Sequence, residues 1–264
     1  MRTSDSTGLN NPLRICLWSG PRNVSTALMY SFAQRRDTRA VDEPLYAHYL
    51  RMTGAQHPGR DEVLAEMEND GAKVVKEVIL GPCDRPVFFM KQMAHHLIGL
   101  DCGFLKQTVN VLLVRDPAWV LPSLAKKVSD IGVRDTGFAF LSELQRRLRA
   151  WGQDPPVLDA KYLLRDPPGV LKILCEALGI EFDPAMLRWE TGPHPEDGVW
   201  ARYWYHNAHL STGFQPDHEE PESLPENLLP LLEECQSHYK RLKADAIRTT
   251  PPRAKDGRSP SRAF

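Results

Sequence analysis

An apolar run that stops at a tight turn constrains this chain more than any other segment. Residues 13–19 read LRICLWS, Gly20 and Pro21 follow, and residues 22–26 read RNVST ahead of a helix-like segment. The pattern predicts a strand, a turn and the start of a helix. The first N–H groups of a helix lack partners within it and carry a partial positive charge. We therefore expect the turn to bind a phosphate-like anion.

The polar side chains of this turn fit the same interpretation. Arg22 offers a bidentate guanidinium, and Ser25 and Thr26 offer hydroxyl donors. The segment has one Gly, an Arg and no Lys, so it lacks the spacing of the Walker A motif that binds magnesium nucleotides. The alternative is an ordinary strand-to-helix turn with polar residues on the surface.

A second segment repeats the arrangement of strand, turn and helix. Residues 109–114 (VNVLLV) are almost wholly apolar, as in a buried parallel strand, and Arg115-Asp116-Pro117 follows. Pro117 suits the first position of a helix. Ser123, eight residues after Arg115, would lie about two turns into that helix. Arg115 and Ser123 can therefore converge on one ligand.

Together the two segments resemble the sulfotransferases that use 3′-phosphoadenosine 5′-phosphosulfate (PAPS). In that family a Ser/Thr-x-Pro-Lys/Arg-Ser-Gly-Thr-Thr loop holds the 5′-phosphosulfate, and an Arg and a later Ser hold the 3′-phosphate. The resemblance assigns Arg115 and Ser123 to the 3′-phosphate. It assigns the 5′-phosphosulfate to Ser19, Gly20, Pro21, Arg22, Asn23, Val24, Ser25 and Thr26.

The resemblance extends through residues 158–183 and spans the chain from residue 13 to about residue 190. It implies transfer of a sulfuryl group from PAPS to a hydroxyl or amine of a small soluble acceptor, with 3′-phosphoadenosine 5′-phosphate (PAP) as product and no metal.

Two other functions stay open on the same scaffold. Val24 stands where the family usually has Gly, and a positive φ is costly for a β-branched residue. This departure favours a non-catalytic, sulfotransferase-like nucleotide-binding protein. A phosphoryl transferase would need Mg²⁺ and an Asp near a strand end, for which Asp116 is the candidate.

The same resemblance assigns catalytic roles. Arg22 would stabilise the leaving phosphate. The base that deprotonates the acceptor would be Glu43, because some bacterial members carry a Glu-Pro there, or His96 of the His95–His96 pair, because eukaryotic cytosolic members have a His after a strand end. Lys91 would contact the sulfate or Glu43, or would be a solvated charge at the end of a strand.

Aromatic residues are concentrated between Trp200 and Tyr205. They would either stack on the adenine or pack within a segment that covers the site. Arg202 is a further candidate for the 3′-phosphate, with a solvated helix face as the alternative.

Composition excludes several classes of protein. A net charge of −1 argues against general nucleic-acid binding and against a polybasic membrane surface. The five cysteines are scattered without a CxxC pair, which argues against a zinc site or a disulfide framework and fits a reducing cytoplasm. The chain shows no signal-peptide pattern and no apolar run of about 18 residues. We therefore expect a cytoplasmic protein. The sequence does not indicate the oligomeric state.

Alternating strands and helices predict the fold. We expect an α/β single domain with a central parallel sheet, helices on both faces and a P-loop-like phosphosulfate loop at the carboxyl edge. The domain would span residues 12–247, between a disordered N-terminus (1–11) and a disordered basic tail (248–264). Strands are expected at 14–18, 38–42, 87–91, 109–114 and 156–159, with another near 73–76. Helices are expected at 25–36, 61–70, 117–130, 137–151, 168–178 and 224–245.

Overall fold

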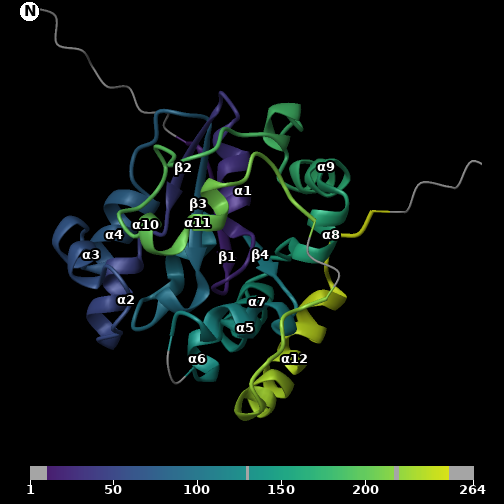
Figure 1. The fold of residues 1–264 in the computed structure, drawn as a ribbon. Coiled ribbons are helices and arrows are strands. Elements are labelled where there is room, and N and C mark those ends of the chain that lie inside the picture. Colours follow the sequence, from purple (N-terminus) through teal and green to yellow (C-terminus); the bar gives the residue numbers. More distant parts are fainter. Residues whose placement is uncertain (1–10, 129–130, 217–219, 250–264) are drawn as a thin grey trace, which may run out of the picture.

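Five parallel strands form one central sheet in a computed structural model that describes residues 11–128, 131–216 and 220–249. The spatial order of the strands is β2-β3-β1-β4-β5 (Figure 1). The strands are β1 (Leu13–Ser19), β2 (Thr38–Asp42), β3 (Val87–Met93), β4 (Val109–Val114) and β5 (Val157–Asp159). The predicted α/β class and parallel sheet are confirmed. The predicted disordered ends, 1–11 and 248–264, fall largely outside the described residues.

Helices connect the strands. The α-helices are α1 (Ser25–Ala33), α2 (Tyr46–Thr53), α3 (Arg60–Glu66), α4 (Gly71–Val74), α5 (Pro117–Ala125), α6 (Val133–Thr136), α7 (Phe138–Ala150), α8 (Ala160–Arg165), α9 (Pro167–Ala177), α10 (Ala201–Trp204), α11 (His206–His209) and α12 (Leu229–Ala244). The other helical turns are η1 (Val75–Ile79), η2 (Ala94–Leu97), η3 (Cys102–Gln107), η4 (Pro184–Leu187) and η5 (Glu226–Leu228). The six helices expected from the sequence correspond to α1, α3, α5, α7, α9 and α12, each of which ends earlier than expected. None of the helices in the described ranges is long and apolar enough to cross a membrane.

The central strands β1 and β4 are buried on both faces, which explains why they are mostly apolar rather than alternating. Successive side chains of β1 enter different cores: Ile15 and Leu17 pack with α1, α8 and α9, whereas Cys16 and Trp18 share a cluster with residues of α5, α7 and α12. The central strand is thus held from both sides. The position of its carboxyl end, where the loop to α1 begins, is therefore fixed.

The strand expected near 73–76 is wrong, because this segment is helical. Asp70 caps α4 by accepting hydrogen bonds from the backbone N–H groups of Ala72 and Lys73, and the chain continues as the π-helical turn η1. Val74 and Ile79 enter the same core as Trp18. The β-branched residues here favour a strand locally, but the cap and the buried face select a helix.

A third, smaller apolar cluster lies beside the carboxyl ends of β2 and β3. It joins α2 and α3 to α10 and includes Tyr46, Leu50, Val63, Trp200 and Tyr205. The aromatic residues expected to cover the site therefore reach it from a segment distant in sequence. This cluster forms one wall of the cavity described next.

Candidate active site

The loop between β1 and α1 borders a cavity of about 450 Å³. Residues 21–26 line the cavity, and Ser25 and Thr26 form the first turn of α1. Ser19 and Gly20 do not line it. Ser19 is fully buried and its hydroxyl contacts the sulfur of Met93, while Gly20 packs against the backbone of Thr136. These two residues shape the loop from behind.

The backbone of the loop is strained at Arg22 and relaxed at Val24. Arg22 has φ 54°, in the left-handed region, whereas Val24 has φ −87°. The conformational conflict that a β-branched residue would cause is therefore absent. The Asn23 carboxamide holds the loop: its oxygen accepts from the Val24 N–H at 2.8 Å and its nitrogen donates to the Leu113 carbonyl at 3.1 Å. Asn23 thus fixes the loop against β4 through its side chain.

The structure brings Arg22, Arg115 and Ser123 together, because β1 and β4 are neighbours and α5 follows β4. Arg22 Nε donates to Ser123 Oγ at 2.8 Å, and Arg115 donates to the Arg22 carbonyl at 3.2 Å. Arg22, assigned from the sequence to the opposite end of the nucleotide, also donates to the Trp204 carbonyl at 3.5 Å. Burial and the neighbouring charge of Arg115 lower the pKa of Arg22. Two guanidiniums in one cavity favour a polyanionic ligand.

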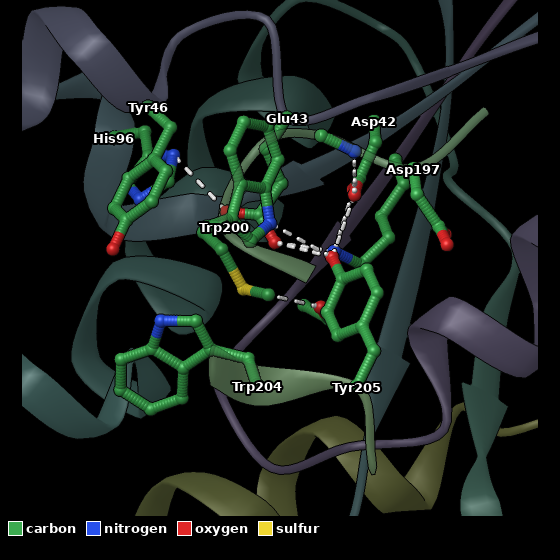
Figure 2. A network of polar contacts seen from close by, with 12 residues as sticks. Asp42, Glu43, Tyr46, His96, Asp197, Trp200, Trp204 and Tyr205 are labelled. Atoms are coloured by element: carbon green, nitrogen blue, oxygen red, sulfur yellow. Dashed lines mark hydrogen bonds and ion pairs between the residues drawn. The ribbon is translucent and has the colours of Figure 1, made fainter. Parts of the chain in front are cut away.

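A buried ionic cluster lies at the ends of β2 and β3. The strand register places Lys91 beside Asp42, and the Lys91 ammonium donates to Asp42 at 2.8 Å, to Glu43 and to the Tyr205 hydroxyl at 2.6 Å (Figure 2). Tyr205 in turn donates to Asp42 at 2.7 Å. Lys91 is 0% exposed, so the interpretation as a solvated charge is wrong and its contact with Glu43 is found.

This cluster changes the acid–base properties of its members. Burial raises the pKa of Glu43, and Asp42 adds to the rise while Lys91 opposes it. Burial alone would lower the pKa of Lys91, but the two carboxylates raise it above its ordinary value. Glu43 also has a positive φ, 36°. Among the described residues, Arg22 and Glu43 are the only ones other than glycine with a positive φ. Strain of this kind is concentrated at functional sites.

The two residues considered as the base are neighbours. His96 Nδ1 lies 4.0 Å from Glu43 Oε2, and the His96 ring stacks on Tyr46 with centroids 5.1 Å apart. Burial lowers the pKa of His95 to about 3 and that of His96 well below its ordinary value, so both imidazoles are neutral near pH 7. Figure 2 shows Tyr46 and His96 side by side next to Glu43.

A family model for the sulfotransferase domain matches residues 13–246. The chain belongs to the sulfotransferase domain family. Branched-chain-amino-acid aminotransferase-like protein 2 of Arabidopsis thaliana is 42% identical over 227 residues, 86% of this chain and 40% of the relative. Protein 1 of the same name and organism is 42% identical over 243 residues, 89% and 44% of the two chains. The chain thus spans less than half the length of the curated relatives it matches.

Among solved structures, a sulfotransferase from Alicyclobacillus acidocaldarius aligns with 90% of this chain. The alignment takes in 97% of that structure's chain, at 14% identity and a TM-score of 0.49.

The aromatic residues of this sulfotransferase domain serve mainly as packing. The Trp200 indole donates to the Tyr205 hydroxyl at 3.1 Å, and Tyr203 donates to Glu62 at 2.9 Å. Trp204 lines the cavity. Arg202 pairs with Glu62 and is exposed, and it does not line the cavity. The alternative of a solvated helix face agrees with this position.

Sequence reasoning did not place Asp42, Tyr46 and Tyr205 in contact with Lys91, Glu43 or His96 at the candidate site. The signal available for Asp42 was its position beside Glu43 at the end of a predicted strand. Tyr205 was expected only as one of the aromatic residues that stack on the adenine or cover the site. Its contact with Lys91 was not predicted, because Tyr205 comes from a segment more than a hundred residues away that reaches the cluster by tertiary packing.

Asp116, the residue considered for a magnesium site, caps α5. Its carboxylate accepts from the Ala118 N–H at 3.0 Å and from Gln236 at 2.8 Å. In the part of the chain that the structure describes, no three His, Cys, Asp or Glu residues are gathered so that they could hold a metal ion.

Proposed function

We propose that this protein transfers a sulfuryl group from PAPS to a hydroxyl or amine of a small soluble acceptor, with PAP as the second product. One observation carries the proposal: a buried carboxylate, Glu43, lines the same cavity as the guanidiniums of Arg22 and Arg115. Sulfuryl transfer requires both, since a proton leaves the acceptor while negative charge builds on the departing phosphate.

The donor would lie along the loop and the start of α5. Ser25, Thr26 and the backbone N–H groups of the loop suit the 5′-phosphosulfate, and Arg115 and Ser123 suit the 3′-phosphate. Arg22 belongs to the loop by its backbone and contacts the Ser123 hydroxyl by its side chain. We assign Arg22 to the charge on the leaving phosphate, so its bond to Ser123 must break or be shared when the 3′-phosphate takes that hydroxyl.

Glu43 is the better candidate for the base. Its Oε1 atom is held by Lys91, while its Oε2 atom faces His96. The raised pKa of Glu43 makes its carboxylate a stronger proton acceptor, and the lowered pKa of His96 makes that imidazole a weak one. In the proposed step the acceptor oxygen or nitrogen bonds to sulfur, the bond from sulfur to the bridging phosphate oxygen breaks, and the proton passes to Glu43. His96 would position the carboxylate.

The two alternative functions lose the observations that supported them. Val24 adopts an ordinary backbone conformation, so its side chain gives no reason to expect a loop unable to hold a sulfate. Asp116 is engaged in capping α5 and in a bond to Gln236.

Radiolabelled PAPS and a mixture of small alcohols and amines test the proposal. We expect label transfer by the wild-type protein and loss of at least about a hundredfold in turnover for Glu43→Gln, as is typical for removal of a general base. PAP affinity, measured by calorimetry, should stay unchanged in this variant. Glu68→Gln, at an exposed position, is the matched control. Full turnover in Glu43→Gln would exclude Glu43 as the base.

A further inference from the structure

The acceptor side of the cavity has an excess of negative charge at its base. Asp42, Glu43 and Lys91 are all buried, and they bring two carboxylates against one ammonium. The histidines nearby do not compensate. Burial lowers the pKa of His57, as it does those of His95 and His96, and all three line the cavity as neutral rings.

Aromatic rings line the cavity together with Glu43. Tyr46 and Trp200 meet edge to face with centroids 5.1 Å apart, and the Tyr46 hydroxyl is hydrogen-bonded to His57 at 2.9 Å. The His57 ring meets that of Trp204 with centroids 5.8 Å apart. All four residues line the cavity together with Glu43. In the view of Figure 2, Tyr46 and Trp204 lie on one side of Glu43 and Tyr205 on the other.

This wall also contains buried polar atoms that have no partner among the described residues. They are Nε1 of Trp204 and Nδ1 of His95, whose side chains line the cavity, whereas Nδ1 of His96 lies 4.0 Å from Glu43 Oε2. His95 and His96 are only 5% and 1% exposed. A buried polar atom without a partner is costly, so these atoms indicate a site that a ligand completes.

We propose that the acceptor is a small alcohol that carries a positively charged ammonium group. This inference rests on the proposed function and names the substrate class. The cation would lie against the ring of Trp204 and the side of the Tyr46 ring that His96 does not cover, since aromatic faces attract cations. The hydroxyl would lie at Oε2 of Glu43. A cation at this place also favours the ionised form of Glu43, which is the form that accepts the proton.

A pair of alcohols of equal shape tests the inference. Choline carries the charge, and 3,3-dimethyl-1-butanol is its neutral isostere. Calorimetry on the full chain, with and without saturating PAP, measures the affinity for each. We expect choline to bind about tenfold more tightly, the ratio that corresponds to a cation–π gain of roughly 1.4 kcal/mol. Equal binding, tighter binding of the neutral alcohol, or binding of neither would overturn the inference.

A tryptophan variant tests where the preference arises. Trp204→Leu should reduce the ratio of the two affinities severalfold. Trp151→Leu, which removes an indole that has the Lys106 ammonium over its face and does not line the cavity, should leave the ratio unchanged. An unchanged ratio in Trp204→Leu would reject the assignment of the cation to the Trp204 face. The wild-type comparison decides the charge preference even where this variant does not fold.

The two proposals fail in different ways. If PAP does not bind and no label is transferred while choline still binds more tightly than its isostere, the sulfotransferase function is wrong and the cationic subsite stands. If PAP binds and label is transferred without any preference for the charged alcohol, the function stands and the subsite inference is wrong.

Discussion

Arg22 and Glu43 hold strained backbone conformations, and each is fixed by neighbours. The Glu43 N–H donates to the Lys91 carbonyl at 2.8 Å, and the Glu43 carbonyl accepts from Tyr46 at 2.9 Å. The Arg22 carbonyl accepts from Arg115. A positive φ in a residue other than glycine costs about 1–3 kcal/mol, which the surrounding structure must offset. The residues assigned to the leaving group and to the base thus both adopt a backbone conformation that is unfavourable by itself.

The assignment of Arg115 to the 3′-phosphate predicts a selective loss of affinity. Charge-assisted hydrogen bonds are worth roughly 1.5–3 kcal/mol. Arg115→Ala should therefore weaken PAP about ten- to a hundredfold and leave 5′-AMP, which lacks that phosphate, nearly unchanged. Calorimetry with both nucleotides measures this, and Arg146→Ala, on the exposed face of α7, is the control. An equal loss for the two nucleotides would show that Arg115 has a structural role only.

The raised pKa of Glu43 predicts the acidic limb of the pH profile. A base must be ionised, so kcat/KM should rise with pH through a pKa above the ordinary carboxyl value of 4.5. Asp42 raises the pKa of Glu43, so Asp42→Asn should move the limb to lower pH. Lys91 lowers it, so Lys91→Met should move the limb to higher pH. Profiles of the three proteins test the signs, and a shift of both variants in one direction contradicts the assignment.

At the scale of elements, the loop after β1 rests on the turn between α6 and α7. Gly137 has φ 77°, and a Cβ there would lie 2.9 Å from the Cα of Gly20. Gly152 has φ 80° with open space around it. Gly137→Ala should therefore displace the loop and weaken PAP at least about tenfold, beyond the roughly 1 kcal/mol cost of a left-handed alanine. Gly152→Ala has that cost alone. Calorimetry and melting curves on both variants separate the effects, and equal PAP affinity in the two would contradict the contact.

The sequence was informative where local pattern and tertiary structure agree. The apolar runs of β1 and β4, each followed by an Arg, located the cavity and its guanidiniums. The register that sets Asp42 beside Lys91 could not be predicted, since it depends on the alignment of two strands separated by α2, α3 and α4. The contact of Arg22 with Ser123 was missed for a related reason. A family motif assigns roles to residues, but it does not specify where a long side chain such as that of Arg22 lies.

At the scale of the whole molecule, the central strand belongs to both cores. Leu17 is fully buried in β1. Leu17→Ala should cost about 2–5 kcal/mol and lower Tm by about 5–15 °C. Because the sheet joins the two cores, secondary and tertiary structure should be lost in one transition. Leu210→Ala, at a position 68% exposed, is the control. Far- and near-ultraviolet circular dichroism measure the two losses, and separate transitions would indicate that the cores unfold independently.

The bonds of Arg22 to the Ser123 hydroxyl and to the Trp204 carbonyl make one side chain common to the two halves of the cavity. A nucleotide that competes with Arg22 for the Ser123 hydroxyl would change how Arg22 holds the part of the cavity wall that carries Trp204. It would thereby change the affinity for the acceptor. Thermodynamic linkage then requires the acceptor to alter the affinity for the nucleotide by the same factor. Nucleotide and acceptor would consequently bind with cooperativity set in part by Arg22, and Arg22→Ala should bring the acceptor affinities measured with and without PAP closer together.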